Sequence, residues 1–432
     1  MTFEFGEYYF GAYHKSGKIL VFSGYYKEEQ KVSGLVLREF DDKTGKPLSE
    51  AKVINEHDYN NEPGTTNIDF DFSPDEKKAL VLFSRSVDDK LVEVKAKIYN
   101  THNFSVIGER VVNSSYQKSA IAFQKHTVNN EGSFIYIFAY QNERTEACYA
   151  LAVQSGITQP AIIKIPAENI TISNYDISLS GNKLLMPVEF LPGAGRDRDD
   201  ITADSVGFGL ITIDIPSLKV QSENFDFLKG EEKAKMDYKI KNPLYKRKDT
   251  DFRNKYFVPY QTITTSDGVY CIWLHRYAFI LGNSNSQMTY NYSREIIVMK
   301  YNTDHKLQWS RVVPRYMLST SSGSRYYLNY AFSGKLHLFY FEHQYNLEDF
   351  PDINNIMGAR EYKSVNPDKS SAVPVMVTIE ANGVMNRIPI GESKIFSFAF
   401  DYSRTILTEK KKIIVLPDDL PRKKERVDLL KF

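Results

Sequence analysis

Two histidines stand where the sequence predicts that a strand ends, and an imidazole at such a place can serve acid–base chemistry or ligand binding. His275, with Arg276 beside it, follows the apolar run VYCIWL, and His343 follows LHLFYFE. Histidine changes charge near neutral pH, so it can take up or release a proton during a reaction. A histidine at a strand end is also often solvated or hydrogen-bonded to its own loop. Both interpretations stay open for these three residues.

No other group of side chains has the spacing of a known catalytic or metal-binding motif. The remaining histidines and the two cysteines do not match a zinc site. No nucleophile elbow, phosphate loop or dinucleotide fingerprint is present. The aspartates at 197–204 lie beside arginines that offset their charge, which favours a flexible hairpin tip over a calcium site. We therefore expect no metal, no cofactor and no catalytic residue, and the sequence favours a protein that is not an enzyme.

The insertion at residues 229–255 is the most distinctive candidate for a binding surface. It carries ten Lys/Arg against five Asp/Glu, and its run Lys246-Arg247-Lys248 is flanked by Tyr238 and Tyr245. Basic side chains interleaved with aromatics can recognise an acidic partner or a nucleic-acid strand. A solvated loop whose aromatics pack on the protein body is the alternative. Because long insertions in compact domains are either functional or disordered, we expect a protein-binding surface here.

Composition limits the partners and the setting. The 432 residues include 55 basic and 54 acidic ones, and a net charge of +1 offers no overall field for a polyanion. We therefore expect a protein partner and no nucleic acid. No apolar run approaches the roughly 18 residues of a spanning helix, so the chain is not expected to cross a membrane. The start lacks a signal-peptide pattern, so we expect a periplasmic or extracellular protein if a signal was removed and a cytoplasmic one otherwise.

The elements that hold the candidate residues are predicted to be β-strands. Tyr (29 residues) and Phe (27 residues) are abundant whereas Trp (2 residues) is rare, and aromatic residues favour strands. The clearest unit lies at residues 67–112. It begins with Ile68, Phe70 and Phe72 alternating with polar residues, as a half-buried strand requires. The SPDEK that follows predicts a turn.

The same order of strand, turn and strand recurs along the chain, which predicts repeated four-stranded antiparallel sheets. The expected units lie at residues 7–56, 67–112, 118–165, 170–225, 256–313, 326–388 and 394–432, the last completed by residues 2–5. We interpret residues 1–432 as one all-β domain, a seven-bladed β-propeller closed by its N- and C-terminal strands. Closure of this kind removes exposed sheet edges. Two packed β-sandwiches are the competing all-β fold.

The blade sequences resemble those of a broad group of β-propellers. DFSPDEKKALVLF is similar to the blades of TolB-like and WD-type repeats, in which an aromatic–Asp–aromatic–Ser–Pro–Asp turn joins the innermost strands. The last third, including HKLQWSRVVPR and GKLHLFYFE, is similar to uncharacterised secreted or periplasmic bacterial propellers. The Gly-His and Trp-Asp pairs of WD40 proteins and the sialidase box are missing. The resemblance therefore implies a fold and a cell-envelope setting, and it transfers no active site.

Two function classes follow from the sequence. The favoured one is a non-catalytic protein-binding or scaffold module that is part of a bacterial cell-envelope assembly. Insertions at unequal positions and the lack of an evident acid–base group favour it. The alternative is a periplasmic or extracellular carbohydrate-active hydrolase or lyase with a site at the propeller mouth. Convergence of His275, His343 and several carboxylates in one pocket would favour the enzyme.

Overall fold

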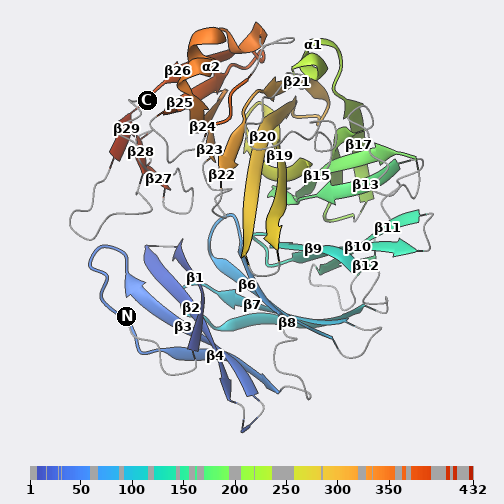
Figure 1. Cartoon of the computed structure of the whole chain (residues 1–432). Coiled ribbons are helices and arrows are strands. Elements are labelled where there is room, and N and C mark those ends of the chain that lie inside the picture. Colours follow the sequence, from blue (N-terminus) through green and yellow to red (C-terminus); the bar gives the residue numbers. More distant parts are fainter. Residues whose placement is uncertain are drawn as a thin grey trace. The chain divides into compact units, whose positions relative to one another are not determined.

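β-Strands dominate the computed structural model, and its helices are few and short (Figure 1). The structure describes residues 7–15, 17–27, 29–30, 32–58, 67–86, 92–114, 121–142, 146–154, 161–162, 170–193, 206–217, 219–235, 257–283, 286–319, 327–332, 334–355, 362–365, 371–390, 405–408, 412–415 and 428–431. The chain divides into two compact units. They are Met1–Ala167 with Leu179–Leu184 and Asp214–Lys219, and Glu168–Ser178 with Leu185–Ile213 and Val220–Phe432.

The first unit holds three antiparallel sheets, each built from strands that follow one another in the chain. Their members are β1 (Glu7–Lys15), β2 (Lys18–Lys27), β3 (Val32–Asp41) and β4 (Lys52–Asp58); β5 (Asn67–Phe72), β6 (Lys78–Ser86), β7 (Val92–Asn100) and β8 (Val106–Ser114); and β9 (Ile121–Val128), β10 (Phe134–Asn142), β11 (Glu146–Gln154) and β12 (Ala161–Ile162).

The remaining sheets lie wholly or mainly in the second unit. Their strands are β13 (Ile170–Tyr175), β14 (Ser178–Ser180), β15 (Lys183–Pro192), β16 (Gly207–Asp214) and β17 (Lys219–Phe227); β18 (Phe257–Thr265), β19 (Gly268–Asn283), β20 (Ser286–Tyr301), β21 (Leu307–Val313) and β22 (Met317–Ser319); β23 (Tyr327–Phe332), β24 (Lys335–His343), β25 (Ala372–Ile379) and β26 (Met385–Pro389); and β27 (Thr405–Thr408), β28 (Lys412–Val415) and β29 (Asp428–Lys431). The short helices are α1 (Gly230–Ala234) and α2 (Gln344–Asp349), with a 3-10 turn at Ile353–Asn355.

The prediction of an all-β fold built from four-stranded antiparallel sheets is confirmed. Its physical basis is visible where β5 pairs with β6, because Phe70 lies opposite Val81 and both join the same apolar cluster. Alternate residues of a strand share one face, so the alternation of apolar and polar residues in the sequence becomes one face in the core.

The predicted turn after β5 is present, and it also ties neighbouring sheets together. Ser73 Oγ donates to Asp75 Oδ1 (2.7 Å), which closes the turn locally. The Asp75 N–H donates to Asn130 Oδ1 in the next sheet (2.9 Å). On the other side, Lys15 Nζ pairs with a Glu76 carboxylate oxygen (2.9 Å) from the preceding sheet. The turns at one end of the three sheets are therefore linked in chain order.

The last sheet differs from the sequence prediction. The sequence predicts one strand over residues 404–416, but the structure has two short strands there, β27 and β28, which pair with each other. The highly polar TEKKK lies where one strand gives way to the other, and such a run is poorly suited to a buried strand. Residues 2–5, expected to complete this sheet, lie outside the described part of the chain, so their pairing stays a prediction.

The core of the first unit is an aromatic layer between its first two sheets. It holds Leu20, Phe22 and Leu37 from the first sheet against Val81 and Phe83 from the second. Aromatic rings also meet across the layer, as between Phe22 and Phe70, whose centroids are 4.6 Å apart. The abundance of Phe and Tyr in the sequence is used here for packing between sheets.

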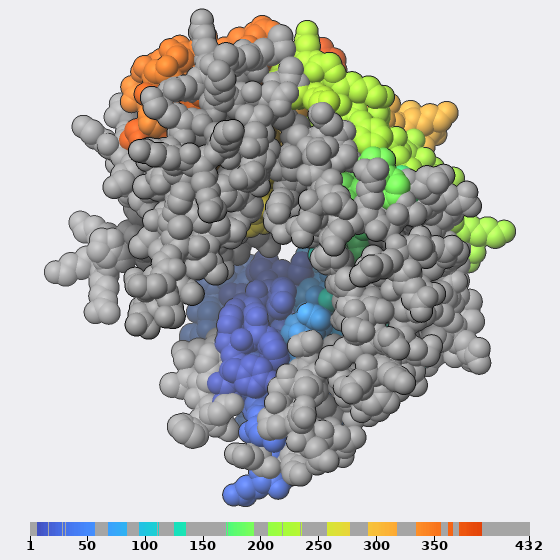
Figure 2. Space-filling model, turned by 45° about the vertical axis from the view of Figure 1, so that its right-hand side comes forward, coloured from blue at the N-terminus to red at the C-terminus, as the bar shows by residue number. Residues whose placement is uncertain are grey.

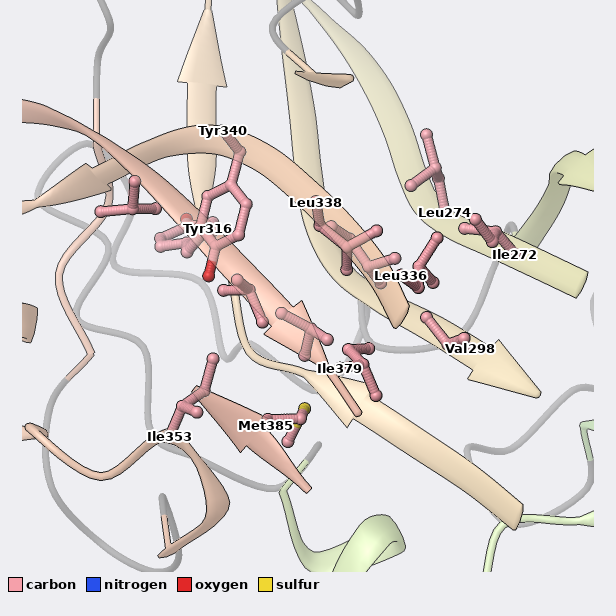
Figure 3. Packing of buried hydrophobic residues seen from close by; sticks show 14 of the residues in the cluster. Ile272, Leu274, Val298, Tyr316, Leu336, Leu338, Tyr340, Ile353, Ile379 and Met385 are labelled. Atoms are coloured by element: carbon pink, nitrogen blue, oxygen red, sulfur yellow. The ribbon is translucent and has the colours of Figure 1, made fainter. Parts of the chain in front are cut away.

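In the second unit, the sheet β18–β21 is covered on both faces. Cys271 and Trp273 of β19 join a cluster with residues of β15 and β16, whereas Ile272 and Leu274 join a cluster with the sheet β23–β26. Figure 3 shows the second cluster, in which Leu274 and Ile272 face Leu336 and Leu338. A strand buried on both faces needs a continuous apolar run, which explains VYCIWL.

A half-buried carboxylate adds to the contacts between β5 and β9. Asp71 Oδ2 accepts the Val128 N–H (3.2 Å). Burial raises the pKa of Asp71, and the hydrogen bond from Thr127 and the nearby His126 only partly offset that rise. The folded protein thus favours the neutral carboxyl, and ionised Asp71 costs stability above the ordinary pKa.

We expect Asp71→Asn to raise the melting temperature of the protein at neutral pH. The amide oxygen can still accept the Val128 N–H, while the cost of burying a charge disappears. The gain should vanish in acid, where Asp71 of the original protein is protonated in both the folded and the unfolded chain. Melting temperature measured from pH 4 to pH 8 checks this, with Asp69→Asn on the same strand as an exposed control. A lower melting temperature for Asp71→Asn at pH 7 would contradict it.

Candidate functional site

His275 lies inside a strand, so the expectation that it ends one is wrong. β19 continues to Asn283, with a register shift between Leu274 and Arg276. The strand continues because the uncharged, β-forming YAFIL follows Arg276. Only 1% of the His275 side chain is exposed. The residue is therefore an interior histidine.

His275 forms a buried polar cluster, here called the histidine cluster, with Glu295 and Arg294. Its Nδ1 lies 2.7 Å from Glu295 Oε2, and Arg294 Nη2 donates to Glu295 Oε1 at 2.7 Å. The imidazole ring stacks on Phe257, with centroids 4.4 Å apart. Each oxygen of the carboxylate thus has a charged or polar partner, as a buried charge requires.

The charges of the histidine cluster follow from these contacts. Burial raises the pKa of Glu295, but the Arg294 charge and the His275 bond outweigh burial and lower it to about 2. Burial lowers the pKa of His275, although Glu295 opposes the change. At neutral pH the imidazole is therefore neutral and carries its proton on Nδ1, because only that tautomer donates to Glu295.

Arg276 and His343 have separate structural positions. Arg276 is half-buried opposite Ser293 of β20, and burial lowers its pKa. His343 is the last residue of β24, which confirms the predicted strand end, and it is the N-cap of α2. Its Nδ1 accepts the Tyr345 N–H (3.1 Å). Burial and the nearby Lys363 lower the pKa of His343.

The structure gives His275 and His343 different partners in different sheets. His275 contacts Phe257 and Glu295, whereas His343 caps a helix. The other candidate residues, Tyr238, Tyr245, Lys246, Arg247 and Lys248, lie outside the described part of the chain.

A second buried cluster, around Glu342, was not found from the sequence. Glu342 Oε1 accepts the N–H of His343 and the Asn346 amide, both at 2.8 Å. Its Oε2 accepts from Arg387 Nη1 (3.1 Å) and from the Tyr362 hydroxyl. Burial raises the pKa of Glu342 despite these donors. This carboxylate is fully engaged by protein groups.

Arg387 and Glu342 hold α2 at its two ends. Arg387 Nη2 donates to the carbonyl oxygens of Asn346 (3.2 Å) and Phe350, which belong to the C-terminal end of the helix. Glu342 accepts an N–H at the N-terminal end. A negative group at the first end and a positive group at the second complement the helix dipole. The ion pair thus makes a six-residue helix stable, although such short helices are marginal alone.

The chain after α2 is fixed against the same cluster. The Asn346 side chain accepts the N–H of Lys363 (2.9 Å) and donates to its carbonyl oxygen (2.8 Å). The Tyr362 hydroxyl, which donates its proton to Glu342, also lies 3.3 Å from Pro314 O, and the Val365 N–H donates to Tyr316 O (2.8 Å). We call residues 344–355 and 362–365 the platform, because bonds to Glu342, Arg387 and Asn346 link the two segments.

Arg315 joins the two clusters. Its Nε donates to Arg294 O (3.2 Å), and its guanidinium lies 6.0 Å from the ring centre of Tyr340. Burial raises the pKa of Tyr340. The charge of Glu342 adds to this rise, and the charge of Arg387 opposes it. The polar groups of the two sheets therefore form one connected interior network.

The sequence contains a pattern that indicates these buried charged residues. Glu342 follows the apolar run LFYF, and Arg294-Glu295 precede IIVM, so each charge sits beside a run that must be buried. Charged residues in such places are expected to pair with one another. The identity of each partner depends on how the sheets pack, which the sequence does not display.

No protein-family model matches the chain, and no curated protein matches it in sequence. Similarity to solved structures is weak. The β-propeller domain of the Trilobed protease from Pyrococcus furiosus has a TM-score of 0.37 at 10% identity, over 99% of this chain and 94% of that one. The WD40 domain of SCAP from fission yeast has 0.33 at 9% identity, over 88% and 86%. A thermostable family-43 glycoside hydrolase has 0.28 at 9% identity, over 51% and 76%.

The described residues contain no group of three or more His, Cys, Asp or Glu side chains arranged to hold a metal ion. Among them, no helix combines the length and apolar character needed to cross a membrane.

The histidine cluster predicts loss of stability in acid. The pKa of His275 is lowered in the folded state, so protonation favours the unfolded chain as pH falls below the ordinary value of 6.5. The pKa of Glu295 is also lowered, so its contribution is complete above 4.5 and is lost as pH falls towards about 2. Both groups therefore destabilise the protein on acidification.

We expect His275→Gln to lower stability at pH 7 by roughly 1–3 kcal/mol, as when a buried hydrogen-bonding group loses its partner. It should also flatten the fall in stability between pH 7 and pH 5, because glutamine does not titrate. Urea unfolding at each pH measures both effects. His14→Gln, at an exposed histidine, is the control and should keep the original slope. An unchanged slope for His275→Gln would exclude His275 as the titrating group.

Proposed function

We propose that this protein is a non-catalytic protein-binding module and that the platform is part of its binding surface. The observation that carries the proposal is the order that the buried Glu342–Arg387 pair imposes on the connection between β24 and β25. Antiparallel neighbours can be joined by about two to five residues. The connection is far longer than the fold requires, and its described residues 344–355 and 362–365 are bonded to the pair and to Asn346.

The energetics of the pair support a role in defining shape. A buried ion pair is often no more stabilising than apolar residues of similar size, because desolvation offsets the attraction. Glu342 and Arg387 instead place the ends of α2 and the return segment with directional bonds. Such bonds favour one backbone arrangement, and a binding surface benefits from being ordered before the partner arrives.

The outer side of the platform has the mixed character of a protein interface. Gln344, Glu348, Asp352 and Lys363 are exposed, and Tyr345 is half-buried with the Lys363 ammonium 3.7 Å from its ring centre. Residues of this sheet and connection, orange in Figure 2, lie at the molecular surface. Polar rims around aromatic residues are common where proteins meet.

One observation favours the alternative, a carbohydrate-active hydrolase or lyase. The carboxylate–imidazole contact of 2.7 Å between Glu295 and His275 has the geometry that orients a histidine base in hydrolases. Against it, the imidazole is buried, stacked on Phe257, and shares its carboxylate with Arg294. Polysaccharide or glycoside turnover that is lost in His275→Gln while the variant remains folded would overturn the non-catalytic proposal.

We further propose that the sheets are the seven blades of one β-propeller, closed by pairing of residues 2–5 beside β29. The recurrence of strand order in every described sheet supports it. The sequence resemblance supports a bacterial cell-envelope assembly as the partner, in the periplasm or outside the cell. The basic run Lys246-Arg247-Lys248 is proposed as a second contact for the same partner.

Closure predicts a cooperative effect of truncation. Removing residues 424–432 deletes β29 and leaves sheet edges without partners. We expect the truncated chain to melt at a lower temperature and to self-associate. Calorimetry and light scattering measure both properties. A truncated chain that stays monomeric and keeps the parental melting temperature would refute closure.

The binding proposal predicts that charge reversal on the platform weakens partner capture. In the double variant Glu348→Lys/Lys363→Glu the net charge is unchanged and both residues are exposed, so folding should be preserved. Each exposed charge contributes at most about 1 kcal/mol, so capture should fall by roughly tenfold and depend on salt. Quantitative affinity purification from the native source measures this.

Two comparison variants complete the experiment. Lys246, Arg247 and Lys248 changed together to Ser should also weaken capture at low salt, since basic groups speed association with an acidic partner. Asp304→Asn, at an exposed turn position, should have no effect. Equal capture of the partner by all variants at low salt would contradict the assignment of both the platform and the basic run as binding surfaces.

A further inference from the structure

The Arg276 guanidinium is a half-buried cation without a partner among the described residues. No described carboxylate lies within ion-pair distance of it, and no described group accepts a hydrogen bond from its side chain. Other arginines of the second unit are bound differently, since Arg294 pairs with Glu295 and Arg387 pairs with Glu342. A cation that is taken out of water needs an anion or hydrogen-bond acceptors in exchange for its hydration. The described part of the chain does not supply them to Arg276.

A buried hydroxyl group lies beside Arg276. The pairing of β19 with β20 (Figure 1) places Arg276 directly opposite Ser293. Side chains that are opposite each other in an antiparallel pair share one face, with Cβ atoms about 5 Å apart. Ser293 Oγ accepts a hydrogen bond from Arg315 Nη2, so its own hydrogen can be donated to another group. A guanidinium and a hydroxyl donor are therefore neighbours on one face of the sheet.

The titratable groups near Arg276 leave its charge uncompensated. Tyr260 of β18 is the described residue whose charge would act on it, and a phenol ordinarily carries no negative charge near neutral pH. The nearby Glu295 is already shared by His275 and Arg294. Burial lowers the pKa of Arg276, as expected for a guanidinium that no acid offsets.

We propose that Arg276 and Ser293 bind the carboxylate group of a ligand. A planar guanidinium can donate two parallel hydrogen bonds to the two oxygens of a carboxylate, and the Ser293 hydroxyl can donate a third. One uncompensated positive charge matches a singly charged carboxylate better than a phosphate group, which carries nearly two negative charges. Arg276 is only half-buried, so a ligand can reach it from solvent.

This site goes beyond the proposed partner binding. Arg276 and Ser293 belong to β19 and β20, whereas the platform follows β24. The carboxylate can come from a free organic acid or from an acidic group of the protein partner, because both present the same two oxygens. Binding of a small carboxylate by the purified chain can be measured without knowledge of the partner.

The uncompensated charge predicts an unusual effect of its removal. Arg276→Met keeps a long apolar side chain and removes the cation, so it should raise the melting temperature in carboxylate-free buffer by about 1 °C or more. Arg311→Met is the matched control, because the Arg311 guanidinium donates to Gly383 O and Ser310 O, both at 2.7 Å. This control should melt at a lower temperature than the original protein. A lower melting temperature for Arg276→Met would show that the chain itself supplies the partner, and it would overturn the proposal.

Acetate is the probe for binding. Thermal unfolding of the purified full chain is measured at pH 7 in sodium acetate, sodium phosphate and sodium chloride of equal ionic strength. A ligand that binds only the folded state raises the melting temperature with its concentration, so we expect a larger rise in acetate than in the other salts. Arg276→Met should lose this acetate-specific rise. Lys306→Met, at an exposed lysine, should keep it.

The outcomes separate this site from the proposed function. Equal effects of acetate and chloride on the original protein would overturn the proposal, and so would an acetate response that Arg276→Met retains. A larger response to phosphate than to acetate would overturn the assignment of a carboxylate. Partner capture by Arg276→Met then identifies the source: weaker capture assigns the carboxylate to the protein partner, and unchanged capture assigns it to a free organic acid. The platform variants test partner binding independently of these results.

Discussion

The platform of the second unit depends on one buried ion pair, Glu342–Arg387. Glu342 lies at the end of a core strand, so its charge must be satisfied in the interior. Arg387 supplies the opposite charge and the hydrogen bonds that end α2. Removal of either partner would leave a buried charge, and the cost of that charge extends to every segment it orders.

In the neighbouring sheet, the histidine cluster likewise supplies partners for a buried carboxylate, that of Glu295. Arg294 and His275 share the two oxygens of Glu295, so three polar residues are placed inside an apolar layer. Arg315 and Tyr340 extend the contacts to the Glu342 cluster. Polar groups that other proteins expose for chemistry are here used to position strands.

Local sequence patterns were enough to predict the strands. The positions and partners of the buried polar residues depend on contacts between residues far apart in the sequence. Alternation around Phe70 and the continuous run before His275 identify half-buried and fully buried strands from neighbouring residues alone. Periodicity did not place His275 in the interior, because the register shift after Leu274 and the extension of β19 depend on pairing with β20. The partnership of Glu342 and Arg387 joins residues 45 positions apart and needs the folded sheet.

The strand order within each described sheet has a consequence for biosynthesis. Nearly every strand pairs with its neighbour in the chain, so a sheet needs only one continuous stretch of polypeptide to form. Such stretches emerge from the ribosome in sequence, and local pairings form faster than distant ones. The first sheets can therefore assemble while later ones are still being translated. Few hydrophobic strands then wait unpaired, which lowers the risk of aggregation during synthesis.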